Sequence, residues 1–300
     1  MTSFYKNNRM LAWIVFFALG AGTSGIFGSG AMASAWTATP NPVPHLQKVL
    51  WVWLENTSYS QMIGQKYTKS LFKKYPSARF SSYQAVSPVT QANAVAMISG
   101  TDFGIQDNDL TKILNPTIVD LLESKNIPWR VYAEEYPGSC YLNAGGAEYQ
   151  RYRVPFLSVG RVQSDRYLCM KVVGFRNLQD DVQYGGLPDF AVVIPSLNGS
   201  GANSSASTAD ATLRKVLDPL VTNDAILQET TVIVTTVNQA DPKNPSLFTF
   251  ILGNGVASGI YTINTPYNHY NLLRTIEDGM GLGNLNQNDA KADPMVGFWH

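Results

Sequence analysis

The stretch from residue 48 to residue 59 constrains the fold of this chain more than any other. It reads Lys-Val-Leu-Trp-Val-Trp-Leu-Glu-Asn-Thr-Ser-Tyr, so an apolar and aromatic run leads directly into Glu55 and Asn56. No polar residue interrupts the run at helical spacing, which predicts a strand covered on both faces. Ligands of open parallel sheets bind beyond the carboxyl ends of such strands. Glu55 and Asn56 are therefore candidate site residues, and the alternative is that they form an ordinary polar turn.

Strand patterns alternate with helix patterns along the rest of the chain. Further strands are expected at residues 129–133, 190–194, 230–236 and 247–252, and helices at residues 61–75, from Thr90, 115–125, 208–220 and 268–280. Alternation of this kind predicts an α/β domain with a mainly parallel central sheet and helices packed on it. The apolar end at residues 295–299 is expected to dock on the body of this domain.

The amino terminus predicts an exported protein. Lys6 and Arg9 precede an apolar run, and Ala33-Ser34-Ala35 follows as a cleavage site, so residues 1–35 form a signal peptide and residues 36–300 the mature domain. The apolar run is short for a transmembrane helix, although an uncleaved anchor is the alternative. We expect a secreted or periplasmic protein with no stable membrane span after cleavage.

The composition allows a large hydrophobic core, and the net charge limits which classes of partner are indicated. The chain has 300 residues, of which 45% are hydrophobic and 15% charged, enough for one large domain. Loss of Lys6 and Arg9 with the signal peptide leaves 22 − 2 = 20 basic residues against 22 acidic ones, a net charge of −2. No nucleic-acid partner is indicated by this balance.

The two cysteines, Cys140 and Cys169, lie on either side of a stretch without clear periodicity. An even number of cysteines in an exported chain favours a disulfide, so we expect one bond that pins an irregular insertion into the domain. The alternative is two separately buried thiols.

Three predicted strand ends carry polar residues that meet at one edge if the sheet is parallel. These are Glu55 with Asn56, the loop at residues 198–203, and Asn238 with Gln239. Thr90 opens a predicted helix, where unpaired backbone N–H groups favour an anion. A helix-capping threonine is the alternative explanation for Thr90.

Four segments resemble a known family, the secreted phosphoesterases of the bacterial acid phosphatase and phospholipase C type in the alkaline-phosphatase-like superfamily. Glu-Asn-Thr-Ser-Tyr at residues 55–59 is similar to the family's Glu-Asn-His-Ser-Tyr metal-binding turn, and Thr-Gln-Ala-Asn at residues 90–93 to its nucleophile turn. Residues 131–140 and 267–278 are close to family sequence, and the resemblance extends over nearly all of the mature chain.

The resemblance implies an alkaline-phosphatase-like fold and hydrolysis of phosphate esters. Thr90 would be the nucleophile, and Glu55 and His269 would be metal ligands. Asn56 and Asn93 would contact phosphate or metal. Enzymes of this kind activate a Ser or Thr hydroxyl on a metal ion that also neutralises the phosphate oxygens.

Several ligand positions depart from the family pattern. The loop at residues 198–203 reads Asn-Gly-Ser-Gly-Ala-Asn where the family has an acid and an imidazole, and Asn238 and Gln239 replace an Asp-Glu pair. Only His269, of the three histidines in the chain, lies in a plausible site. We therefore expect a divalent metal to bind weakly or not at all, with Asn238 and Gln239 as weak ligands at best.

Two functions from different classes follow from these observations. One is a secreted phosphoesterase that uses Thr90 at a reduced metal site. The other is a catalytically inactive family member that acts as a binding or structural module. Arg153 could bind phosphate as a bidentate donor, and together with Asn56, Asn93 and the Thr90 turn it would form a metal-free anion site. Either way, the expected ligand is a small phosphate ester or an anion.

Overall fold

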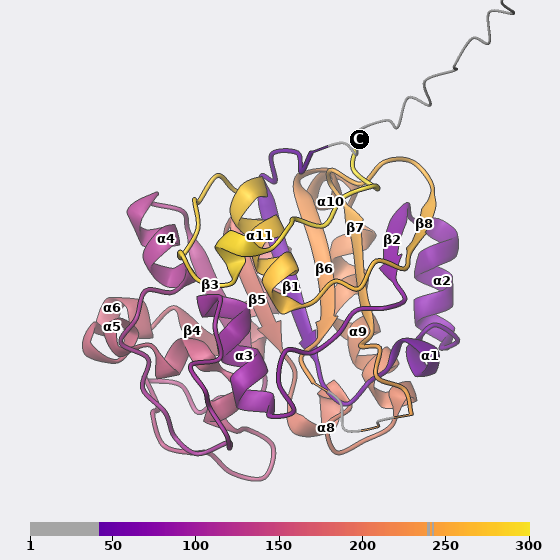
Figure 1. Ribbon diagram of the computed structural model, residues 1–300. Helices are drawn as coiled ribbons and strands as arrows, with labels where there is room; N and C mark the ends of the chain where they lie inside the picture. Colours follow the sequence, from indigo (N-terminus) through magenta and orange to yellow (C-terminus); the bar gives the residue numbers. More distant parts are fainter. Residues whose placement is uncertain (1–41, 239–240, 242) are drawn as a thin grey trace, which may run out of the picture. The chain divides into compact units, whose positions relative to one another are not determined.

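The apolar run at the start of the candidate site forms β1 (Lys48–Leu54), a strand inside the central sheet of the computed structural model (Figure 1). The structure describes residues 42–238, 241 and 243–300, so the predicted signal peptide and Gln239 lie outside the described residues. The side chains of β1 from Val49 to Leu54 are buried. Burial of each large aliphatic side chain contributes about 1.5–3 kcal/mol, which makes β1 a strong organising element.

Eight strands of the described chain form one sheet in the order β4-β3-β5-β1-β6-β7-β2-β8. Their bounds are β2 Ser77–Phe80, β3 Trp129–Ala133, β4 Val172–Gly174, β5 Phe190–Ile194, β6 Thr230–Thr236, β7 Thr249–Gly253 and β8 Ile260–Ile263. β1 pairs in parallel with β5 on one side and with β6 on the other. β7 alone among these strands runs antiparallel to its neighbours, β6 and β2. The predicted mainly parallel α/β sheet is confirmed.

Helices cover both faces of the sheet. One face packs against α3 (Thr90–Ser99), α4 (Ile118–Ser124) and α11 (His269–Gly279), and the other against α2 (Lys66–Lys74), α7 (Phe175–Tyr184) and α9 (Ala206–Val221). Alternate residues of β1 enter the two cores, with Trp51 and Trp53 in the first and Leu50 and Val52 in the second. Covered on both faces, the sheet meets solvent at the ends of its strands, where a ligand can reach it.

Two helix predictions need correction. The segment at residues 61–75 is two helices, α1 (Tyr59–Met62) and α2, because Ser58 caps α1 and its turn ends before Gly64. The helix expected from Asn115 begins at Ile118. Thr117 is its cap, since the Asp120 carboxylate accepts a hydrogen bond from the Thr117 N–H at 2.9 Å and closes a capping box.

Several short elements were not predicted. They are strands β2, β4 and β8, the helix α7, and the single turns α5 (Gly160–Ser164), α6 (Arg166–Cys169), α8 (Leu197–Ser200), α10 (Asp224–Glu229), η1 (Arg151–Arg153), η2 (Pro155–Ser158) and η3 (Asp289–Lys291). Apart from α7, these elements have three to six residues, too few to show a period of their own, so tertiary packing decides their conformation. The ten residues of α7 are enough to show one, and this helix was missed from the sequence. The apolar carboxyl-terminal segment docks as expected, with Met295, Phe298 and Trp299 buried.

No helix in the described ranges has both the length and the apolar character needed to cross a bilayer.

Candidate functional site

The carboxyl ends of β1 and β6 are joined by backbone hydrogen bonds just past the last residue of each strand. The Val237 N–H donates to Leu54 O at 2.8 Å, and the Asn56 N–H donates to Asn238 O at 2.7 Å. The Glu55 N–H donates to Ser200 O at 3.0 Å in α8, which lies at the lower end of the sheet in Figure 1. Residues that are far apart in sequence are thus fixed side by side at one edge of the sheet.

Asn56 turns the chain at this edge. Its φ of 51° lies in the left-handed region, which asparagine tolerates better than most residues. This conformation lets the chain leave β1 sharply after Glu55, so that Thr57 Oγ1 can bond to Thr236 Oγ1 at 2.5 Å. The local sequence therefore holds Glu55 and Asn56 at the mouth of the strand.

Thr90 is the first residue of α3, and its hydroxyl does not cap the helix. The cap residue is Val89, whose side chain makes no capping hydrogen bond. Asn238 Nδ2 lies 3.4 Å from Thr90 Oγ1 and 2.9 Å from Pro88 O, and donates to both. The Thr90 hydroxyl thus lies at the N-terminal end of a ten-residue helix, where backbone N–H groups favour negative charge.

Asn93 supports the Thr90 turn through the backbone. Its Oδ1 accepts hydrogen bonds from the Val86 and Ser87 N–H groups at 2.9 and 3.0 Å. Its Nδ2 donates to Ser87 O and Val89 O at 2.7 and 3.1 Å. The side chain is fully buried, and its donors and its acceptor are all used. The structure therefore gives Asn93 a positioning role in place of the expected phosphate contact.

Arg153 forms a buried ion pair with Glu55. Arg153 Nε donates to Glu55 Oε1, and the two side chains are only 3% and 10% exposed. Arg153 ends η1, which packs against α3, the helix that begins at Thr90. No hydrogen bond joins its two terminal amino groups to another described residue. This leaves two charged donors for a ligand.

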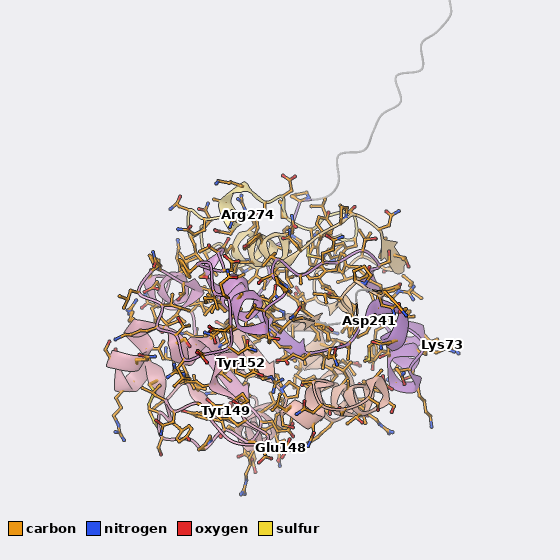
Figure 2. The ribbon with its side chains drawn as sticks, turned by 60° about the horizontal axis from the view of Figure 1, so that its bottom comes forward. Lys73, Glu148, Tyr149, Tyr152, Asp241 and Arg274 are labelled. Atoms are coloured by element: carbon orange, nitrogen blue, oxygen red, sulfur yellow. A yellow bond between two sulfur atoms is a disulfide. The ribbon has the colours of Figure 1, made fainter. Side chains whose placement is uncertain are left out.

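Tyr152 flanks the ion pair. It is half-buried, and its pKa is raised by burial and, to a smaller extent, by the negative charge of Glu55. In the view onto this end of the molecule, Tyr152, Tyr149 and Glu148 lie along one side and Asp241 lies on the other (Figure 2). Tyr152 therefore places an aromatic side chain beside the charged pair.

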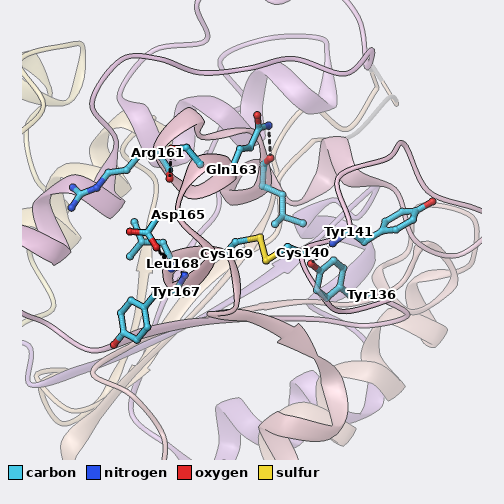
Figure 3. The surroundings of a disulfide bond; sticks show 11 residues. Tyr136, Cys140, Tyr141, Arg161, Gln163, Asp165, Tyr167, Leu168 and Cys169 are labelled. Atoms are coloured by element: carbon cyan, nitrogen blue, oxygen red, sulfur yellow. Dashed lines mark hydrogen bonds between the residues drawn. A yellow bond between two sulfur atoms is a disulfide. The ribbon is translucent and has the colours of Figure 1, made fainter.

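The loop that carries Arg153 is held by a disulfide (Figure 3). Cys140 and Cys169 are bonded, with a Cα–Cα distance of 5.5 Å, as predicted. The bond ties a left-handed turn at Ser139 and Cys140 to helix α6. The insertion is less irregular than expected, because it contains η1, η2, α5 and α6.

His269 is placed at the same edge but its ring nitrogens are both used. It is fully buried at the start of α11. Nε2 donates to Val237 O at 2.8 Å, and Nδ1 accepts from the Tyr83 hydroxyl at 3.2 Å. Burial lowers its pKa to about 4, so the ring is neutral at pH 7. In this arrangement His269 pins α11 to the end of β6 and has no nitrogen left for a metal.

The donors present at this edge do not fit the metal centre that the family resemblance implies. Within residues 42–238, 241 and 243–300, no group of three or more His, Cys, Asp or Glu side chains is arranged to hold an ion. Gly201 follows α8 with a φ of 98°, and a Cβ there would lie 2.6 Å from Glu55 O. A ligand side chain at residue 201 would thus clash with the backbone of β1's end.

Asp241 is the acidic residue closest in sequence to Asn238 and Gln239, and it belongs to a solvated turn. It accepts hydrogen bonds from the Lys243 N–H at 2.9 Å and from Asn244 Nδ2 at 2.7 Å, and these bonds lower its pKa.

Sequence reasoning missed several supporting residues. Asn108 Oδ1 accepts the Gln91 N–H at 3.0 Å, so a distant loop closes part of the first turn of α3. Tyr83 orients His269, and Ser200 O anchors Glu55. Asn108 and Tyr83 fall in no motif, and although Ser200 lies in the loop at residues 198–203, only the contacts in the fold reveal what each of the three does.

A cavity of about 480 Å³ lies at the opposite end of the sheet, beside the starts of β3 and β5. Its charged side chains are already paired: Arg130 with Asp181 at 2.5 Å, Lys171 with Glu123 at 2.5 Å, and Asp189 with Lys48 at 3.5 Å. The charged side chains that line this cavity are thus all used within the fold.

Comparison with known proteins shows which class of proteins this chain is similar to. A protein of the alkaline phosphatase superfamily from Vibrio parahaemolyticus has the same fold, with a TM-score of 0.55 and 13% identity over 86% of this chain and 73% of that one. The phosphate-repressible acid phosphatase of Penicillium chrysogenum is 25% identical over 81% of this chain and 61% of its own length. The phosphatidylinositol-3-phosphatase of Mycobacterium tuberculosis is 27% identical over 92% of both chains.

The Phosphoesterase family model matches residues 77–237, more than half of the chain. The chain belongs to the Phosphoesterase family. It spans about three fifths of the length of the fungal acid phosphatases that it matches, so their activities as whole proteins do not transfer to it directly.

Proposed function

We propose that the edge formed by the ends of β1 and β6 binds a small phosphate ester. The observation that carries this proposal is the meeting of Thr90 with Asn238 at the N-terminal end of α3, beside Glu55 and Asn56. A phosphate placed there would meet a helix N-terminus and the hydroxyl of Thr90, which Asn238 holds in place. Membership of the Phosphoesterase family and the acid phosphatase relatives support a phosphate ester over other anions.

A second candidate function is hydrolysis of the bound ester through Thr90. It is favoured by the position of the hydroxyl, which makes no capping bond and, among the described residues, accepts the long contact from Asn238 alone. Attack by Thr90 Oγ1 on phosphorus would form a phosphothreonine, release the alcohol and leave a second step in which water frees inorganic phosphate. Export through a cleaved signal peptide remains part of the proposal, supported by Ala33-Ser34-Ala35 and by the disulfide.

Binding and turnover are separated by two measurements on one set of proteins. Thermal melting with inorganic phosphate and with p-nitrophenyl phosphate measures binding, and release of p-nitrophenol measures turnover. A ligand at 100 times its Kd raises the free energy of unfolding by about 2.7 kcal/mol, which is a shift of several degrees. The variants are Thr90→Ala and the conservative Thr90→Ser.

The expected result is a melting shift with both ligands in the wild-type protein and in Thr90→Ala. Turnover that Thr90→Ser keeps and Thr90→Ala loses would assign the nucleophile. Absence of both a shift and turnover in the wild type would remove the proposed function. A shift without turnover would leave the protein as a binding module.

A further inference from the structure

We infer that Arg153 is the built-in cation of this site and takes the place of a divalent metal on Glu55. The inference rests on the proposed phosphate-ester site and says which charge that site uses. Its basis is a single contact, the buried guanidinium of Arg153 on the carboxylate that the family resemblance assigns to a metal.

The location of the pair supports this assignment. Glu55 follows the last residue of β1, and its backbone is fixed by Ser200 O, so its carboxylate stays at the strand end. Arg153 is 97% buried as a residue, since only 3% of its surface is exposed. A buried charge needs a partner of opposite sign. The guanidinium fills that role, and a metal ion on the same oxygen would have to displace it against charge repulsion.

The guanidinium can also do what a metal does for a phosphate. One of its N–H groups is committed to Glu55, while its two terminal amino groups have no hydrogen-bond partner in the described ranges. Such planar donors match phosphate oxygens and bind them in pairs. The guanidinium therefore offers charged donors at this edge without any added ion.

The neighbouring residues are also not arranged as metal ligands. His269 uses both ring nitrogens within the fold, and Gly201 leaves no space for a side chain against Glu55 O. Asn238 gives its Nδ2 to Pro88 O and Thr90 Oγ1. These residues are engaged within the fold and are not available as metal ligands. The cation of the site is therefore the guanidinium of Arg153.

The sharpest test is Glu55→Gln, because the two possibilities predict opposite results for it. If a metal on Glu55 carried the phosphate, loss of the carboxylate would weaken phosphate binding. If Arg153 carries it, loss of the competing carboxylate should leave binding unchanged or strengthen it by up to about tenfold. The readouts are phosphate-dependent melting and calorimetric titration with inorganic phosphate, each with and without a chelator.

Arg153→Met and the double variant Glu55→Gln with Arg153→Met complete the set. Arg153→Met should weaken phosphate binding by about tenfold or more. The double variant should bind phosphate as weakly as Arg153→Met, because both lack the guanidinium donors. Arg130→Met is the matched control, because Arg130 pairs with Asp181 at the opposite end of the same sheet. It should change neither readout.

The inference is overturned if a chelator abolishes phosphate binding to the wild type, or if Glu55→Gln abolishes it. Should Glu55→Gln fail to fold, the chelator experiment on the wild type decides alone. If no protein of the set binds phosphate, the proposed function falls. The free energies of unfolding of the two single variants and the double variant then still decide whether Arg153 neutralises Glu55, since adding Glu55→Gln should recover most of the stability that Arg153→Met loses.

Discussion

Glu55 and Glu277 are both buried glutamates, but the protein accommodates them in opposite ways. Glu55 lies at the end of β1 against Arg153. Glu277 lies in α11 with no exposed surface, and its hydrogen-bonding neighbour is the carboxyl group of Asp289, with no donor from an amide or hydroxyl group in the described chain. Burial, followed by the negative charge of Asp289, raises the pKa of Glu277 to about 9, so it is protonated at pH 7.

The difference shows which of the two buried glutamates keeps its negative charge in the folded protein. A buried carboxyl group either pairs with a cation or gives up its charge. Of these two glutamates, Glu55 has a cation as its partner, while Glu277 is left neutral. The charge kept at the edge is the one that the proposed anion site would use. Experiments that unpair or neutralise the two glutamates can break this comparison.

The largest effect is expected from Arg153→Met. Removal of one partner of a buried ion pair typically costs about 3–5 kcal/mol, because the other charge is left uncompensated. Adding Glu55→Gln should recover most of this loss. Urea unfolding of both single variants and the double variant gives the coupling energy. A coupling energy near zero would show that Glu55 and Arg153 do not depend on each other.

A somewhat smaller effect is expected from Cys140→Ser with Cys169→Ser. The cysteines are 29 residues apart, and a loop of this size contributes about 2–4 kcal/mol when closed. Arg153 lies inside this loop and Glu277 lies outside it. The double variant should therefore unfold at lower urea and show a weaker phosphate-dependent shift. If its phosphate shift matched that of the wild type, the disulfide would have no part in holding Arg153.

The sequence predicted the main architecture because its signals are local. The β-branched run of β6 and the apolar run of β1 identify two adjacent strands, and the confirmed parallel pairing follows from the helices between strands. Short edge strands such as β4, with three residues, carry no such signal. Their conformation depends on pairing with neighbours that are distant in sequence.

The candidate site was predictable in its members and not in its contacts. Thr90, Asn238, Glu55 and Arg153 all come from motif positions or strand ends. Whether Arg153 meets Glu55 depends on the path of the disulfide loop, and the partner of His269 is Tyr83, which lies in no motif. Side-chain partners across the fold are set by tertiary packing, and one sequence does not specify them. The roles of these residues therefore stay predictions, with Gln239 outside the described residues.

The smallest effect, counted per pH unit, is the change in the free energy of unfolding that the titration of Glu277 causes. Its folded pKa of about 9 lies above the ordinary value of 4.5. The unfolded chain therefore binds fewer protons between these values, and the free energy of unfolding falls as pH rises, by up to about 1.4 kcal/mol per pH unit. The pKa of His269 is lowered to about 4, so below pH 6.5 His269 makes the free energy of unfolding rise with pH, opposite to the contribution of Glu277. The window from pH 6.5 to 8.5 isolates Glu277.

Urea unfolding across this window should show a falling free energy in the wild type and a flatter profile in Glu277→Gln. The charged groups that face Glu277 are Asp289, Arg274 and Asp278. Asp278→Asn is the matched control, because it removes an acid of the same helix that is paired with Arg274 at 2.8 Å, and it should keep most of the slope. Equal slopes in Glu277→Gln and the wild type would mean that Glu277 is ionised when folded. The contrast with Glu55 would then disappear, because both buried glutamates would carry a charge.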